Sequence, residues 1–178
     1  MKYVALLRGI GPSNPNMRNE RLREVAELVG LCNVETVISS GNVVFETEGA
    51  DPGELESTLE TGWKENLGFE STTIIRSQEA LEGLVEMSPF GDLEHGRKSY
   101  LLVTFCKRPI NVDFDIPHRP ADRDYEIVAA TSGELFTVTD TTNERTPDVM
   151  AWVESRFGKQ ISSRTWLTVE RILKRMGA

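Results

Sequence analysis

The chain has 178 residues, of which 39% are hydrophobic and 27% are charged, a composition typical of a globular protein with one domain or two small subdomains. Twenty basic residues against 28 acidic ones give a formal net charge of −8, which disfavours nucleic-acid binding through clustered lysines and arginines. No apolar run approaches the roughly 18 residues of a membrane span, and the first one, Tyr3 to Leu7, is too short for a signal-peptide core. We therefore expect a cytoplasmic protein with no membrane association.

The first 30 residues predict a strand, a loop and a helix. Residues 2–8 form an almost continuous apolar run between charges, which is typical of a strand buried on both faces. Glycines and prolines then indicate a loop over residues 9–16. A helix should begin near Asn16 or Asn19, either of which can cap it, and should end at Gly30. Its buried face would carry Leu22, Val25, Ala26 and Val29.

A β-hairpin is predicted next, with strands over about residues 34–39 and 42–47. Two β-branched runs flank the segment Ser39-Ser40-Gly41-Asn42, in which Gly41 and Asn42 can adopt the positive φ angles of a tight turn. This turn would present two hydroxyls, an amide side chain and glycine backbone at one end of a sheet. Such a combination suits contact with a ligand.

A second helix and a strand complete the first half. Asp51 as the N-cap, Pro52 at the first helical position and Glu54 in a capping-box pattern predict the start of the helix. Gly68 predicts its end, and the buried face would carry Leu55, Leu59, Trp63 and Leu67. With a strand at residues 72–76, the element order becomes β-α-β-β-α-β, which is the split βαβ order of a ferredoxin-like sandwich.

The second half predicts another α+β subdomain. In chain order we expect a helix capped by Ser77 with Leu81, Leu84 and Val85 on one face, a strand at 100–105, a hairpin of strands 125–130 and 134–139, a helix opened by Thr146 and Pro147 and closed by Gly158, and a last helix over about 164–176. No glycine-rich, serine-rich or proline-rich tether separates the halves. We therefore expect an α+β fold in which subdomains 1–76 and 77–178 pack together.

One glycine pattern resembles a phosphate-binding turn. Gly9-Ile10-Gly11 follows a strand and precedes a helix, whose N-terminal amides can bind anions. The segment lacks a third glycine and a Gly-Lys-Ser/Thr ending, and Pro12 and Pro15 remove amide donors. A chain reversal is the better interpretation, and we expect no cofactor.

The sequence indicates neither a catalytic nor a metal site. His95 and His118 are the only histidines, and no motif ties either to a serine or cysteine nucleophile. Cys32 and Cys106 lack metal-ligand spacing and are expected to be thiols, with a disulfide between them left open. A further group of acidic residues does not match an EF-hand loop and is interpreted as a solvated loop: Asp113, Asp115, Asp122 and Asp124.

The last helix is basic. Its cations are Arg164, Arg171, Lys174 and Arg175, and a favourable interaction with the helix dipole explains them without a ligand. Arg164 is retained as a candidate anion contact because a guanidinium can bind an anion in a bidentate manner. Trp166 is expected to pack, with a preceding serine or threonine as the helix cap.

Three segments together resemble a known family. They are residues 3–10 (YVALLRGI), 40–45 (SGNVVF) and 163–169 (SRTWLTV). Their order and spacing resemble the family called domain of unknown function 1697 over nearly the whole chain. The resemblance implies two α+β subdomains related to ferredoxin-like sandwiches and no established activity. The family usually continues Arg-Gly-Ile with Asn-Val-Gly-Gly and usually has Arg-Asn-Trp near the end, where this chain has Gly11-Pro12-Ser13-Asn14 and Arg164-Thr165-Trp166.

The leading hypothesis is a protein that binds a small polar or anionic ligand between its two halves. Glycines at two loops would allow the ligand to approach the backbone closely. The expected ligand-binding residues are Arg8, Gly9, Asn14, Ser39, Ser40, Gly41, Asn42, Arg164 and Trp166. We expect a monomer or a homodimer.

Two alternatives stay open. An enzyme could use the same cleft, but its catalytic residues are unknown because no general base accompanies Ser39 or Ser40. Single-stranded nucleic acid could stack on Tyr3 and Phe45 of a ferredoxin-like sheet, although the acidic charge and the absence of an RNA-binding signature argue against it.

Overall fold

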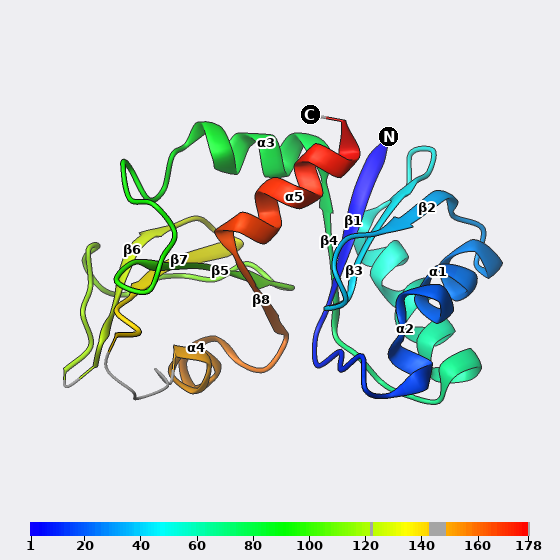
Figure 1. Cartoon of the computed structure of the whole chain (residues 1–178), viewed down its shortest axis with the longest axis horizontal. Coiled ribbons are helices and arrows are strands. Elements are labelled where there is room, and N and C mark those ends of the chain that lie inside the picture. The colour runs from blue at the N-terminus through cyan, green and yellow to red at the C-terminus, as the bar shows by residue number, and fades with distance from the viewer. Residues whose placement is uncertain (122, 143–148, 178) are drawn as a thin grey trace. The chain divides into compact units, whose positions relative to one another are not determined.

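The computed structural model describes residues 1–121, 123–142 and 149–177, and Figure 1 shows the path of the chain. The chain divides into two compact units, Met1–Gly83 with Glu170–Ala178, and Leu84–Val169. Each unit contains one four-stranded sheet whose paired strands are all antiparallel. The predicted α+β class with two subdomains is therefore confirmed.

The first unit contains the sheet with strand order β2-β3-β1-β4. Its strands are β1 (Lys2–Leu7), β2 (Cys32–Thr36), β3 (Asn42–Glu46) and β4 (Thr73–Ser77). Strand β1 lies between β3 and β4, and every residue from Tyr3 to Leu7 is buried. Both faces of β1 are thus buried, as its continuous apolar run predicts.

Two helices pack on one face of this sheet, α1 (Asn19–Leu28) and α2 (Pro52–Leu67) (Figure 1). Asp51 caps α2, because its carboxylate accepts the amides of Gly53 at 2.9 Å and Glu54 at 3.2 Å. Gly68 ends the helix in the left-handed conformation, with φ of 73°. The apolar face predicted for α2 lies in the core with α1 and the inner side of the sheet, and its members are Leu55, Leu59, Trp63 and Leu67.

The start of α1 differs from the prediction. Neither Asn16 nor Asn19 caps the helix, because the capping position is Arg18, whose side chain makes no capping bond. A short 3-10 helix, Pro15–Met17, precedes α1 and is capped by the side chain of Asn14. The Asn16 side chain instead donates to the Leu67 carbonyl at 3.1 Å, so it serves the last turn of α2.

The connection between β2 and β3 is longer than predicted. Strand β2 ends at Thr36 and β3 begins at Asn42, so a five-residue loop, residues 37–41, replaces the tight turn at Gly41-Asn42. Asn42 is a buried strand residue whose side-chain amide donates to the Val37 carbonyl at 2.8 Å and to Ser40 Oγ at 3.0 Å. The tight-turn prediction was wrong because this amide stabilises a wider loop instead.

Helix α2 also covers the free edge of β4. Glu60 Oε1 accepts the Thr73 amide at 2.9 Å, and Glu56 Oε1 accepts the Ile75 amide at 3.0 Å. Glu56 and Glu60 are four helical residues apart, or about 6 Å, and Thr73 and Ile75 are two strand residues apart, or about 6.6 Å, so the carboxylates and the amides have matching spacings. The carboxylates therefore satisfy the outward amides of an edge strand and block its pairing with another chain.

The second unit contains the sheet with order β6-β7-β5-β8. Its strands are β5 (Tyr100–Cys106), β6 (Tyr125–Ala130), β7 (Glu134–Thr139) and β8 (Ile161–Thr165). The hairpin of β6 and β7 has the predicted boundaries. The helices are α4 (Val149–Phe157), which lies in this unit, and α3 (Gln78–Glu86) and α5 (Trp166–Met176), each of which contributes residues to both units.

Several second-half predictions need correction. Strand β8 was missed, and Arg164 lies in this strand rather than at the start of the last helix, which begins at Trp166. The β8 sequence Ile-Ser-Ser-Arg-Thr is short and polar, and its pairing with β5 rather than its own pattern makes it a strand. Val85 of α3 is exposed, not buried as expected. The predicted helix start at Thr146 and Pro147, and Asp122 of the acidic loop, lie outside the described residues.

Candidate functional site

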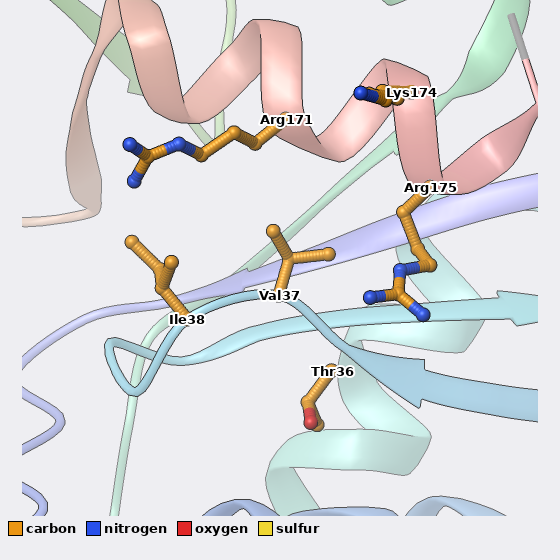
Figure 2. Close-up of a pocket in the computed structure, with 6 residues that line it drawn as sticks. All are labelled: Thr36, Val37, Ile38, Arg171, Lys174 and Arg175. Atoms are coloured by element: carbon orange, nitrogen blue, oxygen red, sulfur yellow. The ribbon is translucent and has the colours of Figure 1, made fainter.

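The first unit has an open pocket between α5 and the segment that follows β2 (Figure 2). Its volume is about 500 Å³, within the range of small-molecule sites. The lining residues, all of the first unit, are Thr36, Val37, Ile38, Arg171, Lys174 and Arg175. The pocket therefore combines three cations with a segment that is largely apolar.

The basic side of the pocket follows from the pattern of α5. Arg171, Lys174 and Arg175 are spaced i, i+3 and i+4, which places them on one face of a helix. All three are exposed. The opposite face is apolar and buried, through Val169, Ile172, Leu173 and Met176. Amphipathic folding of α5 therefore directs its three cations together toward solvent.

The apolar side of the pocket is the start of the loop between β2 and β3. Val37 is buried, whereas Ile38 is 41% exposed and has a φ of 50°. A β-branched residue in this left-handed region costs about 1–3 kcal/mol and needs support from its surroundings. A hydrogen bond of the neighbouring residue provides this support, since the Val37 amide donates to the Asn42 carbonyl at 3.0 Å. Figure 2 shows the side chains of Val37 and Ile38 pointing toward α5.

The three cations differ in their partners. Arg175 Nη1 lies 2.7 Å from Glu35 Oε2, and both side chains are about half exposed. Among the described residues, the side chains of Arg171 and Lys174 make no hydrogen bond or ion pair. The pocket and its rim thus bring together three positive charges and one negative charge. Such an arrangement can bind an anion that also has an apolar part.

The loops predicted to contact a ligand meet in the first unit. The Gly41 carbonyl accepts the Leu7 amide at 2.8 Å. A Cβ on Gly41 would lie 2.6 Å from Ile10 Cγ1 and 2.9 Å from Leu7 Cβ, and the φ of Gly41 is 76°. Gly9 also has a positive φ, 71°, but a Cβ there would meet open space. Gly41 is therefore needed for close packing of the two loops, whereas Gly9 is needed only for its backbone conformation.

Four other predicted ligand-binding residues lie in the first unit. The half-buried Arg8 accepts a hydrogen bond from Ser71 Oγ on its carbonyl, at 2.7 Å. Asn14 caps the 3-10 helix and is exposed. Ser39 is exposed, while Ser40 Oγ accepts from the Asn42 amide. Ser39 and Ser40 follow Ile38 directly, so the predicted loop and the pocket are continuous in the chain.

Arg164 and Trp166 belong to the second unit. Arg164 is 8% exposed, and its Nη1 donates to Ser162 Oγ at 2.9 Å and to the Ser163 carbonyl at 2.7 Å. Burial lowers the pKa of Arg164 to about 10, so its guanidinium stays charged at neutral pH. Trp166 makes edge contacts with Phe90 and Phe136, at centroid distances of 5.3 and 6.1 Å.

A second pocket, of about 390 Å³, lies in the second unit. Its cation, Arg156, pairs with Asp113 at 3.3 Å and lies over the rings of Phe114 and Trp152, at 5.9 and 5.6 Å. The guanidinium therefore already has a carboxylate and two aromatic partners. This pocket is the weaker candidate for an anion.

The histidines and cysteines are the other side chains with reactive groups. His95 Nδ1 accepts the Leu101 amide at 3.2 Å, and the ring of His118 contacts those of Phe114 and Trp152, at centroid distances of 4.3 and 6.1 Å. Cys32 and Cys106 are both free thiols. The described residues contain no group of three or more His, Cys, Asp or Glu that could hold a metal ion. They also contain no helix with the length and apolarity that crossing a membrane requires.

None of the six pocket residues was assigned to a site by the sequence analysis. The spacing of Arg171, Lys174 and Arg175 was a usable signal, but the helix dipole explained their charge. Only the tertiary structure shows that this face of α5 lies opposite Val37 and Ile38.

Comparisons with known proteins agree with the fold. The model of a family described as "Protein of unknown function (DUF1697)" matches residues 1–136. A search of the curated proteins finds no match. Among solved structures, the conserved bacterial protein SP0830 from Streptococcus pneumoniae is similar, with a TM-score of 0.71 and 18% identity over 99% of this chain and 98% of that one. At this identity the likeness shows the fold alone. Because the family model covers more than half of the chain, the protein belongs to the DUF1697 family.

Proposed function

We propose that the protein binds a small anionic ligand in the basic pocket of its first unit. The observation that carries this proposal is the pair Arg171 and Lys174, two cations without a partner among the described residues, which line the same pocket as the apolar residues Val37 and Ile38. The nine residues expected from the sequence stay a prediction. Of these, Ser39 and Ser40 are adjacent in the chain to the pocket segment.

The pocket chemistry suits an organic phosphate monoester or an organic carboxylate better than a bare inorganic ion. Arginine forms bidentate hydrogen bonds with planar or tetrahedral oxyanions, and lysine adds a mobile point charge. A volume of about 500 Å³ exceeds what one phosphate group needs, so a ligand body can rest on Val37 and Ile38. The strained φ of Ile38 supports this assignment, because strained backbone is concentrated at ligand sites.

The competing explanation is the helix dipole. Lys174 and Arg175 lie in the last turn of α5, where cations are favourable without any ligand. Arg171 lies one turn earlier, where the dipole effect is weaker. The two explanations differ in one measurable respect, since only a binding site makes stability depend on added anion.

Binding should be measured on the full chain by calorimetry and thermal unfolding, with glucose 6-phosphate, citrate and inorganic phosphate as probes. A ligand at 100 times its Kd would stabilise the fold by about 2.7 kcal/mol, which raises Tm by several degrees. Arg171→Gln with Lys174→Gln should abolish this shift.

The matched control is Arg18→Gln with Arg23→Gln. It removes two exposed positive charges of α1 and its preceding residue, outside the pocket, and should keep the full shift. Equal loss in both double variants would mean that net charge, not a site, is responsible. Tight salt-dependent binding of single-stranded RNA with no response to the small anions would favour the nucleic-acid alternative.

A further inference from the structure

We propose that the pocket selects ligands with two anionic groups separated by an uncharged middle, and that Glu35 and Arg175 determine this selection. The inference rests on the proposed function, because it assigns the ligand class of the same pocket. Sugar bisphosphates and α,ω-dicarboxylates share this chemistry.

The cations are placed at two separate points of the pocket. Arg171 and Arg175 are four residues apart, so their backbone attachment points differ by about 6 Å along the helix axis. Figure 2 shows the guanidinium of Arg171 above Ile38 and that of Arg175 on the other side of Val37. The positive groups therefore flank an apolar surface. A ligand that spans them needs an anionic group at each end.

The two ends of the pocket are unequal. Arg171 and Lys174 have no partner among the described residues and can accept a first anionic group without displacing anything. Arg175 Nη1 lies 2.7 Å from Glu35 Oε2, so a second anionic group must compete with the Glu35 carboxylate for Arg175. A ligand with one anionic group gains little from this competition, because it can already use the two unpartnered cations.

Displacing Glu35 from Arg175 is energetically easy. Exposed ion pairs contribute little to stability, because water and salt screen both charges. A ligand phosphate carries more charge than a carboxylate and forms stronger hydrogen bonds with a guanidinium. Glu35 therefore acts as a weak competitor that the second anionic group of a ligand displaces and that discourages occupation of Arg175 by weaker groups.

The test compares fructose 1,6-bisphosphate with fructose 6-phosphate, and adipate with hexanoate, by calorimetry on the full chain. The wild type should bind each ligand with two anionic groups about tenfold more tightly than its partner with one, the increment of one charged hydrogen-bonding group. Arg175→Gln should reduce the ratio to about twofold or less while the Kd of the ligand with one anionic group changes less than twofold. Glu35→Gln should tighten binding of the bisphosphate by about two- to fivefold.

Arg23→Gln is the charge-matched control and should leave both affinities and their ratio unchanged. Equal affinity of the wild type for ligands with one and with two anionic groups would overturn the inference while leaving anion binding intact. So would an equal weakening of both classes by Arg175→Gln. Binding of neither class would overturn the proposed function itself. A preference limited to the bisphosphate or to the dicarboxylate identifies which anionic group the pocket takes and supports the inference.

Discussion

Gly41 shows how one residue supports the loop that lines the candidate pocket. Its positive φ and the closeness of Ile10 and Leu7 are independent constraints, and only glycine satisfies both. The sequence indicates only the conformational freedom of Gly41. The contact with Ile10 could not be foreseen, because it joins loops about thirty residues apart.

Gly41→Ala should therefore be more damaging than Gly9→Ala. Both substitutions place a Cβ at a positive φ, which costs about 1–2 kcal/mol. At Gly41 the added carbon also overlaps Ile10 and Leu7, and overpacking costs a further 1–3 kcal/mol, roughly. Urea unfolding of the two variants would measure the difference. Equal losses of stability would show that the loop yields easily at this contact.

At the scale of elements, helix α2 has two structural roles, and only one of them is predictable from its sequence pattern. Its apolar face was predictable, because Leu55, Leu59 and Trp63 recur at four-residue spacing. Its role at the edge of β4 was not, because Glu56 and Glu60 look like ordinary surface residues in the sequence. The match between helical and strand spacing becomes visible only when β4 lies alongside.

Replacing Glu56 and Glu60 by alanine should destabilise the first unit and expose the edge of β4. Each substitution removes a hydrogen bond to a charged carboxylate, which is worth about 1.5–3 kcal/mol. The exposed strand should also promote self-association. Chemical unfolding together with sedimentation would detect both effects. Glu65→Ala, on an exposed position of the same helix, should change neither.

The same scale explains the error at β8. Residues 161–165 carry two serines, an arginine and a threonine, and no alternation marks them as a strand. Pairing with β5 places Ser162 and Arg164 in buried positions that a local pattern cannot predict. Arg164 stays hydrogen-bonded there, which is how a buried guanidinium is tolerated.

At the scale of the molecule, the end of the chain belongs to the same compact unit as its beginning. Residues 170–178 group with the first unit, and the Lys2 ammonium donates to the Met176 carbonyl at 2.7 Å. Ile172, Leu173 and Met176 are buried. The subdomain boundary expected at residue 76 stays a prediction.

Removal of residues 170–178 should strongly destabilise the first unit. The deletion removes the burial of three large apolar side chains and exposes the apolar surface that they cover, which costs about 5 kcal/mol or more, comparable with the whole stability of a small domain. Thermal unfolding of chains 1–169 and 1–178, and of the fragment 1–76, would measure this. A fragment 1–76 that unfolds cooperatively at the Tm of the full chain would support the boundary at residue 76 and contradict the need for the last helix.

The sequence by itself determined the α+β class, the β-α-β-β-α-β order, the caps of α2, the hairpin of β6 and β7, and the family. These depend on local periodicity, capping chemistry and turn residues, which are readable over a few positions. The tertiary structure alone decided the wide loop after β2, the strand β8, the covered edge of β4 and the basic pocket. Each of these arises from groups distant in the chain, such as Arg175 and Glu35, whose meeting depends on how the elements pack.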